Sequence, residues 1–229
     1  MKIQIFAISA LLMCSAGLQA QVAGGVPTAQ GKGDYHLGFR IAPRISTLGY
    51  GLEAAKGFTP NFGMRMGFNY FTYGYNDTES GTSYNLDLGL KSFAVIADWH
   101  PFKGSFRLSG GLLLNGNKLE LTGSNLGSVD LDGTTYSLDS LTGDVSYNAI
   151  APYFGLGWDT TFGDHEHWGF TFDLGLVYTG SPKVGLNAHM PAPPASFASD
   201  LERERSTLEG ELDMLTWWPV LSTGIVYQF

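Results

Sequence analysis

The chain has 229 residues, including 31 glycines and 31 aromatic residues (15 Phe, 11 Tyr and 5 Trp), and its mean hydropathy is +0.00. Acidic residues outnumber basic ones by 21 to 13, which argues against nucleic acid as a partner because binding to phosphates needs clustered lysine and arginine. No stretch beyond the first 20 residues reaches 18 apolar residues, which excludes a helical membrane span there.

The first 20 residues have the features of a secretory signal peptide. Lys2 supplies a positive charge, residues 3–12 form a short apolar run, and the small residue Ala20 stands at the expected cleavage site. The apolar run is shorter than the roughly 20 residues of a spanning helix. We therefore expect secretion across the inner membrane, with residues 21–33 forming an N-terminal periplasmic segment before the folded domain at 34–229.

Cys14 is the only cysteine and lies inside this signal. A lipoprotein reading is open, although Met13 argues against it because the lipoprotein signal needs a small residue before the cysteine. Cleavage after Ala20 leaves a chain with neither disulfides nor thiol chemistry. Cleavage also removes Lys2, so the predicted mature chain has 12 basic and 21 acidic residues and a net charge of −9.

Large apolar residues alternate with small or polar ones along most of the remaining chain. In 168–179, for example, Trp168 and Phe170 alternate with Gly169 and Thr171, the pattern of a strand between two different environments. Seven such strands are clear. Bacterial barrels usually have an even number of strands, so we expect an eighth strand before the other seven. The turn between this strand and the next is expected within 43–49. The strands are expected at 34–42, 46–58, 62–73, 84–100, 105–121, 145–161, 168–179 and 217–229.

The sequence therefore predicts an all-β fold: an antiparallel, up-and-down transmembrane barrel of eight strands in an outer membrane. Within 84–100 the apolar positions change face between Leu90 and Phe93, which indicates either a β-bulge or the point where the strand leaves the membrane. Connections alternate between short periplasmic turns and long extracellular loops. The short ones are expected at 59–61, 101–104 and 162–167, and the long ones at 74–83, 123–143 and 180–216.

One segment, 195–215, has apolar residues at helical spacing. Ser199 with Glu202 forms a potential capping box. The proline-rich stretch 191–194 is expected to form a stiff, extended segment that leads into the helix. We expect an amphipathic helix in the longest extracellular loop, either packed on the barrel rim or placed as a lid over the lumen. Its acidic character disfavours burial in the outer leaflet.

Several motifs resemble a proteobacterial family of small outer-membrane barrels with no assigned activity. The segment 225–229 (IVYQF) looks like the signal that such barrels present to the barrel-assembly machinery, with Tyr227 and Phe229 as its key residues. The resemblance covers most of 34–229. It implies the fold, the location, and contact with outer-membrane lipids and lipopolysaccharide, and it leaves the oligomeric state open. The other motifs are 97–102 (ADWHPF), 106–111 (FRLSGG), 115–118 (NGNK) and 151–158 (APYFGLGW).

Charged residues occur on the strand faces that should point into the lumen. Glu53 with Arg65, and Asp98 with Arg107, are each equidistant from the centre of a tight turn. Both pairs are therefore expected directly opposite each other across their hairpins. Eight strands leave an interior just wide enough for side chains or one small ligand, so these charges are expected to fill the barrel. Further lumen-facing charges are Asp159, Asp173 and Arg40.

No motif indicates catalysis. His165 and His167 form a weak potential metal site because a third ligand is lacking, and Ser109 and Ser222 face the lumen with no histidine expected nearby. We predict no enzyme, no metal and no cofactor. The sequence favours a structural or surface-interaction protein. The alternatives are a narrow channel or carrier for a small, apolar molecule and, less favoured, a lipid-modifying enzyme.

Overall fold

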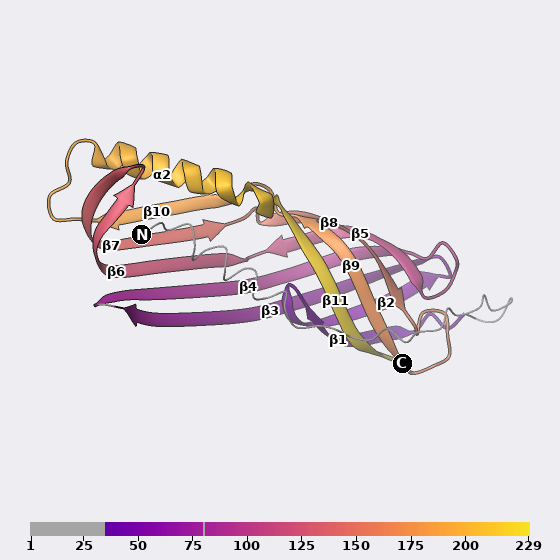
Figure 1. Ribbon diagram of the computed structural model, residues 1–229. Coiled ribbons are helices and arrows are strands. Elements are labelled where there is room, and N and C mark those ends of the chain that lie inside the picture. Colours follow the sequence, from indigo (N-terminus) through magenta and orange to yellow (C-terminus); the bar gives the residue numbers. More distant parts are fainter. Residues whose placement is uncertain (1–34, 80) are drawn as a thin grey trace.

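A closed antiparallel barrel forms one half of the protein (Figure 1). The computed structural model describes residues 35–79 and 81–229, so the expected signal peptide at 1–20 and the segment 21–33 lie outside the described residues. The eight barrel strands are β1 (Phe39–Ser46), β2 (Gly49–Thr59), β3 (Phe62–Glu79), β4 (Thr82–Trp99), β5 (Phe106–Asn115), β8 (Ile150–Asp159), β9 (Trp168–Tyr178) and β11 (Trp217–Gln228).

These strands pair in the order β4-β3-β2-β1-β11-β9-β8-β5, and β5 closes the ring by pairing with β4. The predicted eight-stranded barrel is confirmed. The first strand begins at Phe39 rather than at residue 34, and its turn at 47–48 lies within the expected interval. The tight turn at 60–61 and the longer turns at 100–105 and 160–167 lie together at the end where the chain terminates.

The barrel exposes large apolar side chains on its outer face and buries charged side chains in its lumen. On β9, Phe170 is 67% exposed whereas Asp173 is 1% exposed, and the alternation continues along the whole strand. This distribution is the reverse of that in a soluble protein and matches a barrel surrounded by lipid. Among residues 35–79 and 81–229, no helix is long and apolar enough to cross a membrane.

Beyond the barrel, β3 and β4 continue into an open sheet that we call the outer sheet (Figure 1). It consists of residues 71–79 and 82–90 together with three further strands, which extend it from β4 in the order β6, β7, β10. The expected long loops at 74–83 and 123–143 are therefore wrong, because both segments form hairpins of this sheet. Its additional strands are β6 (Lys118–Leu131), β7 (Thr134–Ser146) and β10 (Lys183–His189).

The expected strands at 105–121 and 145–161 are each divided in two. β5 and β6 both pair with β4 and are separated at Gly116 and Asn117, where Gly116 N–H donates to the Lys91 carbonyl at 2.9 Å. The pairing of β3 with β4 runs without a register shift. A bulge within 84–100 is therefore wrong, and the irregularity belongs to the neighbouring chain segment.

The change of apolar face on β4 has a different cause. Leu86, Leu88 and Leu90 have the same parity as Ala94 and Ile96, which face the lumen. Because side chains alternate along a strand, all five residues point to the same side. The barrel part of β4 also carries large apolar residues on its lipid-facing side, whereas the outer sheet carries them only on the inner side. The switch therefore marks where the strand leaves the lipid-facing region.

The helix α2 (Phe197–Glu211) and the 3-10 helix η2 (Leu212–Thr216) lie over the outer sheet (Figure 1). The expected capping box is wrong: Ser196 is the N-cap, and Ser199 lies inside the helix with its hydroxyl donating to the Ser196 carbonyl at 2.7 Å. The start of α2 packs against the tip of the β6–β7 hairpin. The buried residues of this contact are Val129, Leu131, Tyr136, Leu138 and Phe197.

The edge strand β10 is covered by the same helix. Val184 N–H donates to Glu209 Oε1 at 3.1 Å, and Arg205 donates to the Val184 carbonyl at 3.5 Å. Unpaired groups on an exposed sheet edge promote association with other strands. Arg205 and Glu209 satisfy two of these groups and also form an ion pair with each other at 2.6 Å.

Candidate functional site

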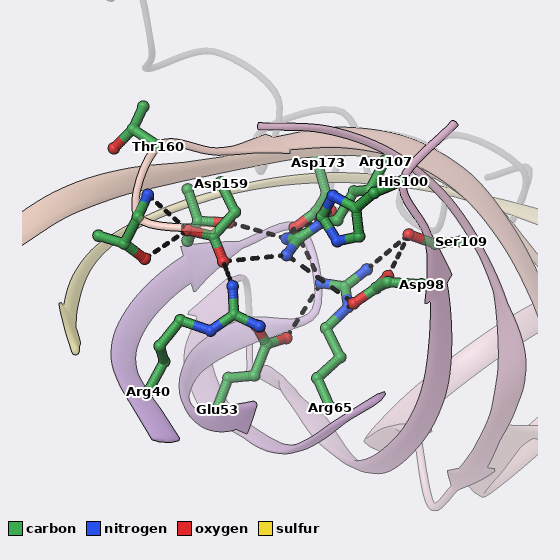
Figure 2. Close-up of polar contacts among 12 residues, drawn as sticks. Arg40, Glu53, Arg65, Asp98, His100, Arg107, Ser109, Asp159, Thr160 and Asp173 are labelled. Atoms are coloured by element: carbon green, nitrogen blue, oxygen red, sulfur yellow. Dashed lines mark hydrogen bonds and ion pairs between the residues drawn. The ribbon is translucent and has the colours of Figure 1, made fainter. Parts of the chain in front are cut away.

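A layer of charged side chains crosses the lumen at the end of the barrel near the C-terminus (Figure 2). It contains four arginines and four carboxylates among the described residues, and each is at most 8% exposed. Seven of the eight barrel strands contribute to it. Burying a charge without a partner costs several kcal/mol, so the equal numbers of opposite charges are needed here. The residues are Arg40, Arg44, Glu53, Arg65, Asp98, Arg107, Asp159 and Asp173.

Asp173 on β9 is the centre of this charged layer. Its carboxylate accepts hydrogen bonds from Arg107 at 2.9 Å, from Arg65 at 3.0 Å and from Arg44. Arg107 also donates to the Thr171 hydroxyl at 2.8 Å. One carboxylate therefore connects β9 to β1, β3 and β5 across the lumen.

Arg65 connects the carboxylates of neighbouring strands. Its guanidinium lies 3.1 Å from Glu53 and 3.1 Å from Asp98, and it donates to the Ser109 hydroxyl at 3.2 Å. Ser109 in turn donates to Asp98 at 2.5 Å. The Asp98–Arg107 distance is longer, at 3.9 Å, so Arg65 is the principal partner of Asp98.

The expectation that both pairs lie directly opposite each other is wrong. Glu53 faces Gly67 and Asp98 faces Ser109 in the strand register, a displacement of two residues in each hairpin. In the first hairpin, a register shift between Gly57 and Thr59 moves the centre of the turn. The ion pair between Glu53 and Arg65 forms diagonally because both side chains are long enough to span the offset.

Arg44 was not among the residues expected in the lumen. It lies on β1 with the same parity as Arg40 and contacts both Glu53 and Asp173. Extending the alternation of the first predicted strand past residue 42 would have placed it there. The proline at 43 concealed this signal, because proline normally marks the end or edge of a strand.

Arg40 closes the charged layer at the rim. It donates to Asp159 at 2.5 Å and lies over the Phe162 ring at 5.0 Å. His100, just beyond β4, stacks on the same ring at 3.4 Å and bonds to the Gly104 carbonyl at 2.7 Å. Burial lowers the pKa of His100 to about 4, so this histidine is neutral at physiological pH.

Above the charged layer, the interior becomes apolar. A cavity of about 40 Å³ separates the two layers and is bordered by Glu53, Arg65 and Tyr153, enough space for a few water molecules. The apolar layer then fills the lumen towards the outer sheet. Its buried residues are Leu48, Ala94, Ile96, Leu113, Ala151, Tyr153, Val177 and Val220.

A second pocket of about 40 Å³ lies where the lumen meets the outer sheet, beneath η2. Trp218 forms part of its wall and packs against the apolar layer. The Trp218 indole N–H is buried and has no hydrogen-bond partner among the described residues. The remaining lining residues are Leu88, Leu90, Asn117, Lys118, Leu119, Val145, Tyr147, Leu212 and Leu215.

The structure does not bring the other candidate residues into a reactive arrangement. His167 bonds through Nδ1 to the Gln228 carbonyl at 2.9 Å, and the His165 ring lies 5.7 Å from that of His36. In the described part of the chain, no group of three or more His, Cys, Asp or Glu residues is arranged to hold a metal ion. Ser109 donates to Asp98 and accepts from Arg65, and neither of these partners is a histidine.

The solved structures that resemble this chain include two from Acinetobacter baumannii. The crystal structure of Acinetobacter baumannii CarO2 is 25% identical with a TM-score of 0.57, and the match covers 84% of this chain and 99% of that chain. Acinetobacter baumannii CarO is 22% identical with a TM-score of 0.55, covering 86% and 100%. No protein family and no curated protein sequence matches the chain. The neighbours are eight-stranded barrels of the Gram-negative outer membrane, which assigns the same architecture and membrane to this protein.

Proposed function

We propose that this protein is a closed, non-enzymatic outer-membrane barrel whose role is to hold the outer sheet and α2 at the cell surface. The observation that carries this proposal is the charged layer, in which eight buried and mutually paired side chains cross the lumen. An apolar layer follows it towards the outer end. An interior of eight strands has little room beyond such side chains, so the barrel serves as an anchor.

Conductance in a planar lipid bilayer tests the closed barrel. The unmodified protein is expected to give no large, stable channels. A matched variant opens both layers: Arg65→Ala and Asp173→Ala remove one charge of each sign from the charged layer, and Ile96→Ala with Tyr153→Ala shortens two side chains of the apolar layer. This variant should conduct if it folds. Large, stable channels from the unmodified protein would overturn this proposal and favour the channel alternative.

The surface location can be tested by labelling engineered cysteines in intact cells, because the predicted mature chain has none. Thr207 lies on the exposed side of α2, and Glu166 lies in an exposed turn at the opposite end of the protein. Each is replaced by cysteine in turn. A membrane-impermeant maleimide should label residue 207 in whole cells and residue 166 only after the outer membrane is permeabilised. The reverse result would refute the proposed orientation.

The partners proposed for this role follow from the barrel surface. Exposed apolar side chains cover the outer face, with Phe154 at 61% and Phe170 at 67% exposure, and they would contact outer-membrane lipids and lipopolysaccharide. The chain ends with Tyr227 and Phe229 on the same outward-facing side. We propose that the barrel-assembly machinery reads this ending during insertion.

A further inference from the structure

Three lysines, which we call the lysine band, lie on the outward surface where the outer sheet joins the barrel: Lys91 on β4, Lys118 on β6 and Lys183 on β10. Lys118 and Lys183 are both paired with Ser146 of β7. Lys118 is also paired with Gly89, which is two residues from Lys91. Paired residues, and residues two apart on one strand, point to the same face. Strand spacing places the Cα atoms of neighbouring lysines about 8–10 Å apart, so one ligand can contact all three.

The lysine band begins where the apolar outer surface of the barrel ends. On β4, Phe93 points outwards at 40% exposure, and Lys91 takes the next outward position. Lys91 is paired with Tyr70 of β3, and its ammonium lies 5.6 Å from the centre of the Tyr70 ring. The following outward positions on β3, Thr72 and Gly74, carry no large apolar side chain. Tyrosine is enriched where lipid meets water, so this boundary passes close to Tyr70 and Lys91.

The positive charge at this boundary is confined to one side of the barrel. Within the described residues, the other lysines are Lys56 and Lys103, which lie towards the opposite end, near the turns at 60–61 and 100–105. On six other barrel strands, the outward position at the outer end is an exposed apolar or aromatic residue. These residues are Ile45, Tyr50, Leu114, Ile150, Tyr178 and Trp217.

Three carboxylates lie on the same face as the lysine band, one row farther from the barrel. Asp87 is paired with Glu120, and Glu120 is paired with Asp144. Glu120 also forms an ion pair with Lys118. Negative groups of a ligand are therefore attracted at the lysine band and repelled beyond it. This order of charges favours a ligand that keeps its anionic groups at the membrane boundary over a soluble polyanion that spreads across the sheet.

We propose that the lysine band binds the phosphate groups of lipid A, the acylated glucosamine disaccharide that anchors lipopolysaccharide in the outer leaflet. The phosphates would accept charge-assisted hydrogen bonds from the lysine ammonium groups. The acyl chains would lie against Phe68 and Phe93, which are paired on the outer surface. This site deepens the anchoring role and rests on its placement of the outer sheet outside the membrane, because it fixes one side of the barrel to lipopolysaccharide.

The reactivity of each lysine tests the site in the full protein, folded in detergent micelles. Acetylation by N-hydroxysuccinimidyl acetate, followed by peptide mass spectrometry, gives a rate for each lysine with and without diphosphoryl lipid A. Ammonium groups bound to phosphate react slowly, so the rates of the lysine band should fall at least about fivefold. The rates of Lys56 and Lys103 should not change. Lipid A without phosphates, at the same fraction of the micelle, should leave all these rates unchanged.

Neutral variants test whether the lysines supply the affinity. Lys91→Gln with Lys118→Gln and Lys183→Gln should bind diphosphoryl lipid A at least about tenfold more weakly, as measured by native mass spectrometry of protein released from the micelles. Lys56→Gln with Lys103→Gln is the matched control and should bind normally. Replacing the three lysines of the band by arginine should retain binding. Folding is checked by heat-dependent gel migration, and Lys91→Gln alone is used if the triple variant does not fold.

The proposal is overturned if the lysine band is not protected, if Lys56 and Lys103 are protected equally, if lipid A without phosphates acts equally, or if the folded glutamine variant binds normally. Equal protection by soluble polyphosphate would assign the band to free polyanions and also overturn the proposal. Micelles have no inner or outer side, so this measurement does not depend on the orientation of the protein. A failure of the anchoring role in the cysteine-labelling experiment is therefore distinguishable from a failure of lipid A binding.

Discussion

The barrel and the outer sheet share two strands, β3 and β4, and β3 places its large apolar residues on opposite faces in the two regions. On the barrel part of β3, Phe62 and Phe68 point outwards while Arg65 is buried in the lumen. Farther along the strand, Tyr73 and Tyr75 point to the inner face of the outer sheet, and the residues on its outer face are small or polar. The surroundings explain the difference: lipid solvates the outer face in the membrane, whereas water surrounds the outer sheet and its apolar face turns towards α2.

The two regions also differ in what holds them together. The barrel interior is joined by ion pairs that connect most of its strands through Asp173 and Arg65. The outer sheet is covered by a helix that packs through Phe197 and Leu201 and is fixed by the bond from the Tyr136 hydroxyl to Asp200 at 2.5 Å. A change in either region should therefore affect that region first.

The largest expected effect is on the charged layer. Asp173→Asn removes a carboxylate shared by Arg44, Arg65 and Arg107 and leaves one arginine charge without balance. Breaking a buried ion pair from one side typically costs about 3–5 kcal/mol. We expect a loss of this size in the free energy of barrel unfolding, measured by urea titration in detergent micelles.

The double variant Asp173→Asn with Arg107→Met serves as the matched control for this prediction. It restores equal numbers of positive and negative charges in the layer and should lose less stability than Asp173→Asn alone. Asp87→Asn, at an exposed position of the outer sheet, should change stability by less than about 0.5 kcal/mol. Additive losses in the double variant would contradict the pairing.

A smaller and local effect is expected where α2 contacts the outer sheet. The hydrogen bond from Tyr136 lowers the pKa of the Asp200 carboxyl, so the contact stabilises α2 above the usual aspartate pKa and is lost as the pH falls through the lowered value. Tyr136→Phe should raise amide exchange of α2 about tenfold at pH 7, as expected for one lost hydrogen bond. Exchange in the barrel strands should not change, because local opening is independent of global unfolding.

The same measurement at low pH sharpens this comparison. In the unmodified protein, α2 should remain protected near pH 4, around the usual aspartate pKa, and lose protection on further acidification. In Tyr136→Phe the loss should begin at a higher pH, once exchange rates are corrected for their intrinsic dependence on pH. Equal pH profiles for the two proteins would show that this hydrogen bond does not hold the helix.

Sequence patterns predict the strands of the barrel correctly but do not predict the outer sheet. Alternation located the lumen-facing residues, including Glu53, Arg65 and Asp98, because lipid and lumen impose a strict period of two. The partners of each charge depend on strand register and on contacts across the lumen, which local patterns do not contain. The sequence of the outer sheet is typical of loops, because residues 123–143 are rich in glycine, serine and threonine, and its edge strand β10 lies within the long segment 180–216.

The smallest expected effect on stability is at the end of the chain. The Phe229 N–H donates to the Phe39 carbonyl at 2.9 Å, and its ring is 58% exposed beside Phe39 and Tyr227. Phe229→Ala keeps the backbone bond and removes one lipid-facing ring, so the purified barrel should lose less than about 1 kcal/mol. In cells, the same variant should lower the amount of folded barrel in the outer membrane, since the ring ends the predicted assembly signal. Phe62→Ala is the control, because Phe62 is 55% exposed on the same outward-facing surface but lies outside that signal. Normal amounts of Phe229→Ala, or an equal decrease with Phe62→Ala, would show that Phe229 acts only as one lipid contact among many.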